Sequence, residues 1–204
     1  MRRLARLAPR PPGPVSELSD TEEMIAAGIA GEQLIADDLG RALGDEWTLL
    51  RGYSNRRGEI DHLLIGPRGI IAIEGKHLNA TVHCDGDDWR FDKYDRYGKL
   101  VEQGRITDRR GRSPSVQLNE PASLLEEFLR PREFRTPVQR VVLLTHHRSR
   151  LGQCANMTVR LATSSDYVIK LASRLPAVLD LAQVAKLEQL IIRDHKYHQA
   201  RRPR

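Results

Sequence analysis

The segment from Glu59 to His77, EIDHLLIGPRGIIAIEGKH, constrains the fold of this chain more than any other. Two apolar runs, EIDHLLI and GIIAIEGK, are separated by the turn-forming sequence GPRG, and this pattern predicts a β-hairpin. If GPRG is the turn, Ile65 pairs with Ile70, and Asp61 then lies opposite Glu74. The hairpin therefore holds two carboxylates about 4.5–5.5 Å apart, measured between their Cβ atoms.

Opposed carboxylates at the end of an apolar hairpin repel each other, and partial burial increases that cost. Lys76 lies two residues beyond Glu74 on the same face and supplies one compensating positive charge. A divalent cation between Asp61 and Glu74 would supply two more. In the simpler alternative, Asp61 caps the strand end, and Glu74 and Lys76 form a surface ion pair worth little.

A third acidic residue is predicted to lie near this pair. The segment SELSDTEEMIAAGIAGEQLIADDLGRAL predicts a helix that Ser19 or Asp20 can cap. Glu32 falls within the apolar stripe of this helix, where a charged residue is not expected. Gly28 and Gly31 would let the helix approach the sheet closely and carry Glu32 towards the hairpin. The stripe consists of Ile25, Ile29, Ile35 and Leu39. Magnesium suits such a set of carboxylates, completed by water and phosphate.

The rest of the chain predicts an α/β fold with a mixed sheet and flanking helices. Further strands are predicted for WTLLRGY, VQRVVLLT and MTVRLAT, and a second hairpin for TVHC–DGDD–WRFDK. Helices are predicted for Ser113–Leu129, which Ser113 can cap, and near Tyr167–Arg174 and Leu181–His195. The polar, basic segment Tyr94–Arg112 is predicted to be a loop.

The length of 204 residues is typical of one domain, which we expect to span residues 17–195. A disordered, basic, proline-rich lead (1–16) and a basic tail (196–204) are expected to flank it. No apolar run approaches the roughly 20 residues that a membrane-spanning helix needs. Cys84 and Cys154 are isolated in the sequence and form no metal-type pair, so we expect reduced thiols and a cytoplasmic location.

The formal net charge of +6 favours a polyanionic partner, and the cations gather after the second hairpin strand. There the run WRFDKYDRYGKL mixes basic and aromatic residues, so nucleic-acid bases could stack while the charges follow the phosphates. The candidate cations are Arg90, Lys93, Arg96, Lys99, Arg105, Arg109, Arg110 and Arg112, and the aromatic residues are Trp89, Phe91, Tyr94 and Tyr97. The alternative is a hairpin with core aromatic residues and a solvated basic loop.

Two pairs of histidines are close enough in the sequence to be candidate metal ligands. His146 and His147 follow a predicted strand, and neighbouring strand residues point to opposite faces, so they should not share one metal. His195 and His198 have the i, i+3 spacing of one helix face and could bind a metal. Their place near a basic helix end fits better with an interaction with the helix dipole.

The motifs GIAGEQL, GEIDHLLIGPRGIIAIEGKH and SPSVQL, with a tryptophan-containing hairpin between the last two, resemble the nuclease-related domain (NERD) family. This family is placed in the PD-(D/E)xK nuclease superfamily. The resemblance extends from about Gly28 to Thr145 and implies a restriction-endonuclease-like core in the order αβββαβ. It also implies Mg²⁺- or Mn²⁺-dependent cleavage of phosphodiester bonds, in DNA more than in RNA.

By this resemblance, Asp61 and Glu74 match the acidic metal ligands, and Lys76 matches the lysine of the superfamily. Glu32 matches the acid of the first helix, and Gln117 matches a glutamine that opens the second core helix. Pro121 falls inside that second helix and can kink it.

The resulting hypothesis places one or two Mg²⁺ ions on Asp61, Glu74 and Glu32, with the Gly75 carbonyl as a further ligand. Lys76 would position or deprotonate the attacking water and offset charge in the transition state. Gln117 would orient the water or a phosphate. A possible homodimer and RNA as the substrate remain open, and the rival function is a catalytically silent module that binds nucleic acid or a protein.

Overall fold

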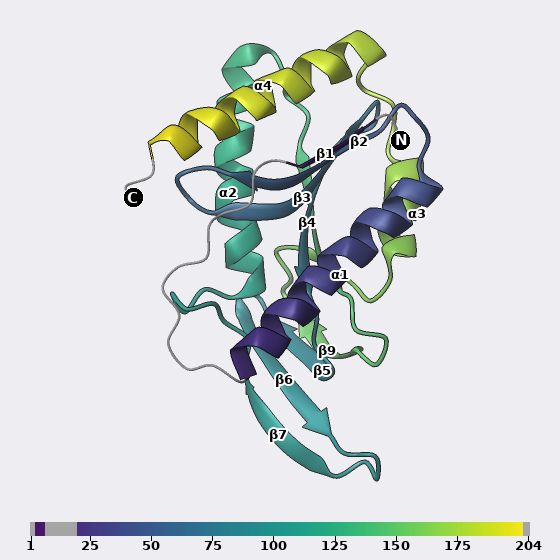
Figure 1. The fold of residues 1–204 in the computed structure, drawn as a ribbon, viewed down its shortest axis with the longest axis vertical. Helices are drawn as coiled ribbons and strands as arrows, with labels where there is room; N and C mark the ends of the chain where they lie inside the picture. Colours follow the sequence, from purple (N-terminus) through teal and green to yellow (C-terminus); the bar gives the residue numbers. More distant parts are fainter. Residues whose placement is uncertain (1–2, 7–19, 202–204) are drawn as a thin grey trace.

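The computed structural model describes residues 3–6 and 20–201, which form two β-sheets with helices packed around them (Figure 1). The larger sheet is mixed and has the strand order β1-β2-β3-β4-β8-β10. Its strands are β1 (Arg3–Arg6), β2 (Thr48–Ser54), β3 (Glu59–Gly66), β4 (Gly69–Lys76), β8 (Val138–Leu144) and β10 (Arg160–Ala162). Strand β3 is antiparallel to both β2 and β4, whereas β8 runs parallel to both β4 and β10.

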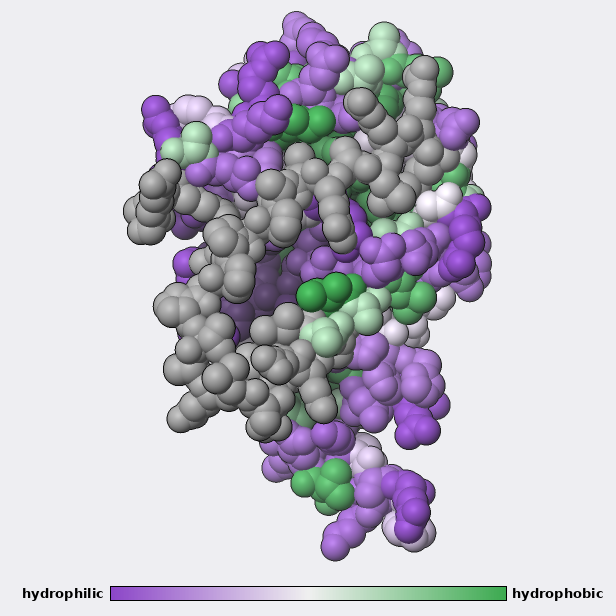
Figure 2. Space-filling model, viewed as in Figure 1, coloured by the Kyte–Doolittle hydropathy of each residue, from purple (hydrophilic) through white to green (hydrophobic). Residues whose placement is uncertain are grey.

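The smaller sheet has the strand order β7-β6-β5-β9. Its strands are β5 (Thr81–Asp85), β6 (Asp88–Tyr94), β7 (Leu100–Arg105) and β9 (Arg150–Ala155). The ends of β6 and β7 project from the body at the bottom of Figure 1, and Figure 2 shows that this projection is largely hydrophilic. The predicted hairpin around DGDD is confirmed as β5 and β6.

Helices cover both faces of the larger sheet. They are α1 (Asp20–Ala42), α2 (Pro114–Leu129), α3 (Ser165–Arg174) and α4 (Leu181–Ala200), and a short 3₁₀ helix, η1 (Arg130–Arg132), follows α2. One face packs against α1 and α3, and the other packs against α2 and α4. The predicted α/β class, a mixed sheet with flanking and C-terminal helices, is confirmed and is compatible with a restriction-endonuclease-like core.

Alternation along the hairpin assigns its side chains to these two layers. Leu63 and Ala72 face the layer of α2 and α4, whereas Leu64 and Ile71 face the layer of α1 and α3. Both sets are fully buried, and each leucine or isoleucine among them contributes about 1.5–3 kcal/mol to stability. The predicted register is confirmed, because Ile65 pairs with Ile70.

The second core helix begins as predicted. Ser113 is its N-cap, and the side chain accepts a hydrogen bond from the backbone N–H of Val116. Pro114 occupies the first helical position, where its missing N–H costs nothing. Pro121 lies inside the helix, and its carbonyl accepts a hydrogen bond from Asn55 Nδ2 at 2.9 Å.

Two strands were not predicted, and the last helix is longer than predicted. Leu100–Arg105, predicted as part of a loop, is strand β7, and Arg150–Ala155 is strand β9. Both strands expose nearly all their side chains, so they show no apolar alternation. The last helix continues beyond His195 to Ala200.

The terminal segments are described only in part. Arg3–Arg6 form β1, parallel to β2. The rest of the lead (1–2 and 7–16), the possible cap Ser19 and residues 202–204 lie outside the described residues. No helix in the part of the chain that the structure describes is long and apolar enough to cross a membrane.

The first helix approaches the sheet closely at only one of the two predicted glycines. A Cβ atom on Gly31 would lie 2.6 Å from Thr145 Oγ1, whereas nothing lies within 4 Å of a Cβ atom on Gly28. Ile29 was predicted to face the core, but it is 57% exposed. Among the side chains of α1 that the structure describes, the buried apolar contacts are made by Ile35, Ala36 and Leu39.

Candidate functional site

The candidate site lies where β3 and β4 separate. Backbone pairing between these strands stops at His62 and Ile73, one residue before Asp61 and Glu74. Beyond that point Asp61 Oδ2 accepts a hydrogen bond from the backbone N–H of Gly75 at 2.8 Å. The N–H and C=O groups of one strand residue point to the same side, so the Gly75 carbonyl also faces this gap.

Lys76 is held by two partners on the face that α2 covers. Its Nζ lies 2.7 Å from Glu74 Oε1 and donates a hydrogen bond to Gln117 Oε1 at 3.0 Å. The amide of Gln117 donates in turn to the carbonyl of Arg112 at 2.7 Å. The first turn of α2 therefore brings Gln117 to the hairpin end, although Pro121 lies in the same helix.

The electrostatics of this group are those of crowded, buried charges. Burial and then the charge of Glu74 raise the pKa of Asp61 well above its usual range, although Lys76 offsets part of the effect. Burial also raises the pKa of Glu74, against the opposing influence of Lys76. For Lys76, burial disfavours the charge, but Glu74 and Asp61 outweigh it and raise its pKa. The ammonium group is therefore protonated at neutral pH.

Glu32 reaches this region from the other face of the sheet. Its charge contributes to the raised pKa of both Asp61 and Glu74. However, its side chain is 41% exposed and forms an ion pair with Arg51 at 3.4 Å. Among the described residues, no group of three or more His, Cys, Asp or Glu side chains is gathered as a metal site. Glu32 is thus near enough to influence the pKa of Asp61 and Glu74, but the three carboxylates are not gathered around one point as metal ligands would be.

Arg51 and His62 support Glu32 and were not singled out from the sequence. They are paired across β2 and β3, and both are buried. Burial and the charge of Arg51 lower the pKa of His62 to about 3, so its imidazole is neutral. Arg51 also donates to Gln33 Oε1 at 3.0 Å. A charged residue in the buried strand TLLRGYS was the available sequence signal.

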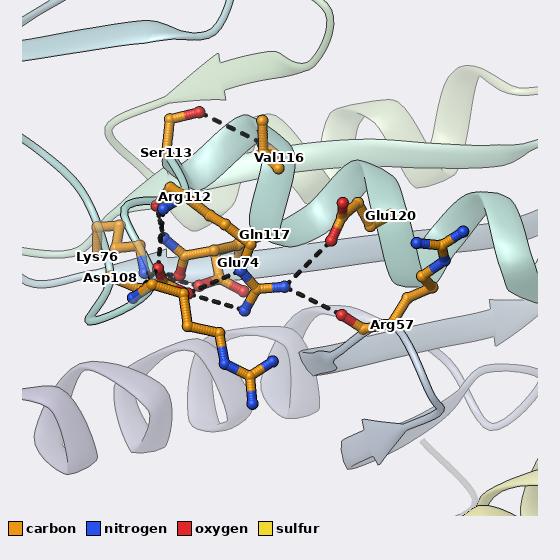
Figure 3. A network of polar contacts seen from close by, with 10 residues as sticks. Arg57, Glu74, Lys76, Asp108, Arg112, Ser113, Val116, Gln117 and Glu120 are labelled. Atoms are coloured by element: carbon orange, nitrogen blue, oxygen red, sulfur yellow. Dashed lines mark hydrogen bonds and ion pairs between the residues drawn. The ribbon is translucent and has the colours of Figure 1, made fainter.

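Arg112 organises the opposite side of the site, and Figure 3 shows its network. Its guanidinium lies 2.8 Å from Asp108 and 3.2 Å from Glu120, and it donates to the carbonyl of Arg57 at 3.0 Å. Its charge offsets part of the rise that burial causes in the pKa of Glu74. Arg112 was predicted to lie in a solvated basic loop. In the structure its guanidinium connects that loop to Glu120 of α2 and to Arg57 of the β2–β3 turn. The signal was the segment TDRRGR, because Asp108 accepts backbone hydrogen bonds from Arg110 and Arg112.

The basic candidates of the β6–β7 hairpin lie away from this site and are largely paired with acids. Arg90 forms an ion pair with Asp88, and Lys93 lies 3.4 Å from Glu102. Arg105 also approaches Asp88, at 3.8 Å. Arg96 and Lys99 are exposed near the end of the projection, and Arg109 and Arg110 are exposed in the loop before α2. Binding of nucleic acid by these residues stays a prediction.

Some aromatic residues of the β6–β7 hairpin are packed inside the protein, and others are exposed. Trp89 is 2% exposed and donates to Ser115 Oγ at 3.1 Å, so it is a core residue and is not available to stack on a base. Phe91 packs against Gly104. Tyr94 and Tyr97 are exposed, the latter by 78%, and Arg96 lies over the Tyr97 ring.

The histidines are arranged differently from the prediction. His146 and His147 follow the end of β8, and their rings stack with centroids 4.6 Å apart rather than pointing to opposite faces. The strand has ended, so strict alternation no longer applies. His195 is buried, and its Nδ1 accepts a hydrogen bond from the backbone N–H of Ser54 at 3.1 Å. His198 lies 3.6 Å from Asp194.

Comparison with known proteins identifies the family. The model of the nuclease-related domain matches residues 27–145, from α1 to the residue that follows β8. No curated protein and no solved structure matches the chain. The matched range contains the whole group at the hairpin end, namely Glu32, Asp61, Glu74, Lys76 and Gln117. Because the match covers more than half of the 204 residues, this chain belongs to the nuclease-related domain family.

Proposed function

We propose that this chain is a metal-dependent nuclease that hydrolyses phosphodiester bonds, in DNA rather than RNA. The observation that carries the proposal is the group at the open end of the hairpin, where Asp61 and Glu74 lie beside the ammonium of Lys76. Family membership supports a nuclease-related function. We further propose a cytoplasmic location, where the free thiols of Cys84 and Cys154 are reduced unless an oxidant is present.

The residues present fit a magnesium or manganese ion. Asp61 and Glu74 are adjacent carboxylates whose pKa is raised by burial first, and for Asp61 also by the charge of Glu74, so a bound cation would stabilise their charged forms. Among the described residues, each has one oxygen, Oδ1 and Oε2, that accepts no hydrogen bond. Magnesium is commonly held by one or two carboxylates, with water and substrate phosphate completing the shell. Asp61, Glu74 and the Gly75 carbonyl would hold the ion, and Glu32 would add charge from the α1 side. Bound there, the ion would supply Lewis-acid polarisation of the scissile phosphate.

The protein's own residues supply the rest of the chemistry. Lys76 stays protonated, so it acts as a hydrogen-bond donor and a positive charge towards the developing negative charge on the phosphate. Gln117 fixes the ammonium, because its amide is itself anchored to the carbonyl of Arg112. In the metal-free chain the protonated Lys76 suits the positioning role, and the alternative role of deprotonating water stays open for the metal-bound protein.

The approach of the nucleic acid is suggested by which cations are unpaired. The side chains of Arg109 and Arg110 form no ion pair with any described residue, and the same holds for Arg56 and Arg57 in the β2–β3 turn. Arg112 joins the two loops through the carbonyl of Arg57, so these four arginines flank one region beside the site. Unpaired guanidinium groups at such a place suit a phosphate backbone.

The test is incubation of the purified chain with duplex DNA, single-stranded DNA and RNA in Mg²⁺ or Mn²⁺, beside the Lys76→Ala variant. Cleavage should require the metal and should fall by about 10²–10³-fold in the variant. Lys93→Ala is the matched control. It removes a lysine that is also paired with a glutamate but lies on the β6–β7 hairpin of the small sheet. Cleavage that persists in a rigorously purified Lys76→Ala protein would refute the proposal.

A second candidate function is a catalytically silent module that binds nucleic acid or a protein partner. The favouring observation is that Lys76 already neutralises Glu74, while Glu32 is engaged by Arg51. The two candidates differ in their response to metal. A nuclease should gain thermal stability in Mg²⁺ and lose this gain in Glu74→Ala, whereas a silent module should show the same melting temperature with and without the ion.

A further inference from the structure

The two cysteines of the chain, which are far apart in the sequence, face each other in the smaller sheet. Cys84 on β5 is paired with Cys154 on β9, and these strands run parallel. Neighbouring strands lie about 4.7–4.9 Å apart, which falls within the Cα–Cα distance of about 4.4–6.8 Å that a disulfide bridges. Both residues are free thiols; Cys84 is buried and Cys154 is exposed.

A β-bulge produces this juxtaposition. Thr81 is opposite Arg150 and Val82 is opposite Leu151, but the register shifts before Cys84, so that β9 contains one extra residue. Without the shift, Gln153 rather than Cys154 would lie opposite Cys84. The extra residue therefore brings the second thiol into place.

His83 holds the bulge. Its Nδ1 accepts a hydrogen bond from the backbone N–H of Gln153 at 3.1 Å. A Cβ atom on Gly152 would lie 2.3 Å from the same imidazole ring, so the backbone of β9 can approach only because residue 152 is glycine. The register of the two cysteines is thus fixed by side-chain contacts on the opposite face of the small sheet.

The two thiols also interact. Burial, followed by a hydrogen bond with Cys154, raises the pKa of Cys84 to about 12. A buried thiol with such a pKa does not react with oxidants on its own. The exposed neighbour provides the route by which it could react.

We infer that Cys84 and Cys154 form a reversible modification site, an intramolecular disulfide made on exposure to a small-molecule disulfide. Cys154, as the thiolate, attacks one sulfur of the reagent, which releases a thiolate and leaves a mixed disulfide on Cys154. Cys84 then loses its proton and attacks the Cys154 sulfur, which expels the second half of the reagent. Two protein thiols and one disulfide give one protein disulfide and two small thiols, so atoms and electrons balance.

The bond would close the chain from Cys84 to Cys154. That segment contains β6, β7, α2 and β8, including Arg112 and Gln117 of the candidate site. It would join β9, an edge strand of the small sheet, covalently to the central strand β5. The site is independent of whether the chain is a nuclease.

The test is thiol titration of the full chain before and after incubation with oxidised glutathione. Two free thiols should fall to none, no glutathione should stay bound, and a peptide that joins Cys84 to Cys154 within one chain should appear. Dithiothreitol should restore both thiols. If Cys154 retains glutathione while Cys84 stays free, or if the bond joins two chains, the inference is overturned.

Two variants separate juxtaposition from general reactivity. Cys84→Ala should keep one glutathione on Cys154, because no second thiol can displace it. The double variant Gln153→Cys with Cys154→Ser keeps two thiols but moves one into the bulge beside His83, out of register with Cys84. Intramolecular bond formation should slow at least about tenfold in this variant. An unchanged rate would show that register does not matter and would contradict the inference.

Discussion

The two sheets treat their charged residues in opposite ways. At the end of the β3–β4 hairpin, Glu74 is buried beside Asp61, and the pKa of both is raised. In the small sheet, Lys93 and Glu102 form an exposed ion pair of the kind that contributes about 0–1 kcal/mol. Burying like charges lowers the stability of a fold, whereas the exposed pair costs almost nothing. We infer from this difference that the buried charges of the large sheet serve chemistry. The exposed charges of the β6–β7 hairpin in the small sheet serve solubility and local order.

The strongest test of that difference replaces one carboxylate in each sheet by its amide. In Asp61→Asn, the side-chain oxygen can still accept the hydrogen bond from Gly75, so the fold should persist while the metal loses a charged ligand. Metal-dependent cleavage should fall by about 10²–10³-fold. Glu102→Gln should leave the rate within about twofold, because its charge lies on the solvated hairpin. The measurement is initial cleavage rate in Mg²⁺.

Circular dichroism and thermal melting of both variants provide the control for folding. If Asp61→Asn and Glu102→Gln lowered the cleavage rate equally, the contrast between the sheets would be wrong. A loss confined to Asp61→Asn in a protein that melts cooperatively would support it.

A second test uses pH, with the metal removed by a chelator. The raised pKa of Asp61 and Glu74 means that the folded chain binds more protons than the unfolded chain above about pH 4. Stability should therefore fall as pH rises through this range, by up to about 1.4 kcal/mol per pH unit for each extra bound proton. The raised pKa of Lys76 has its effect only in alkaline solution, where stability is lost as the ammonium deprotonates.

Denaturant unfolding at several pH values between about pH 4 and about pH 8 measures this slope. Glu74→Gln should reduce it and should increase stability near neutral pH, while Glu102→Gln should keep the slope of the natural sequence. Addition of Mg²⁺ should restore stability more at the higher pH, because the ion binds the deprotonated carboxylates. An identical slope in Glu74→Gln would show that this pair does not carry the excess protons.

The same contrast explains how much of the molecule could be predicted. The hairpin was predictable in detail, because the GPRG turn fixes the register and strict alternation separates Leu63 from Leu64. Asp61, Glu74 and Lys76 follow from that register. The exposed strands β7 and β9 were not predictable, since they bury too few side chains to show a period of two.

Long-range polar contacts were the other gap. The ion pair of Glu32 with Arg51 depends on how α1 crosses the sheet, and a helical wheel does not give the crossing. Arg112 joins a loop, a helix and a turn that are adjacent only in the folded chain. The pairing of Cys84 with Cys154 depends on a bulge held by His83, which no local pattern of β9 reveals.

The weakest expected effect concerns which cations contact nucleic acid, and it tests the comparison between paired and unpaired charges. The double variants Arg109→Ala/Arg110→Ala and Arg90→Ala/Lys93→Ala each remove two positive charges, so their effects on net charge are matched. Arg109 and Arg110 form no ion pair with a residue that the structure describes, whereas Arg90 and Lys93 are paired with acids on the β6–β7 hairpin. Loss of the first pair should weaken DNA binding about tenfold and reduce the slope of log affinity against log salt by about 2. Loss of the second pair should leave that slope almost unchanged, because it also releases two acids. Fluorescence anisotropy at several salt concentrations measures both quantities, and a larger loss from the hairpin variant would return the binding surface to the β6–β7 projection.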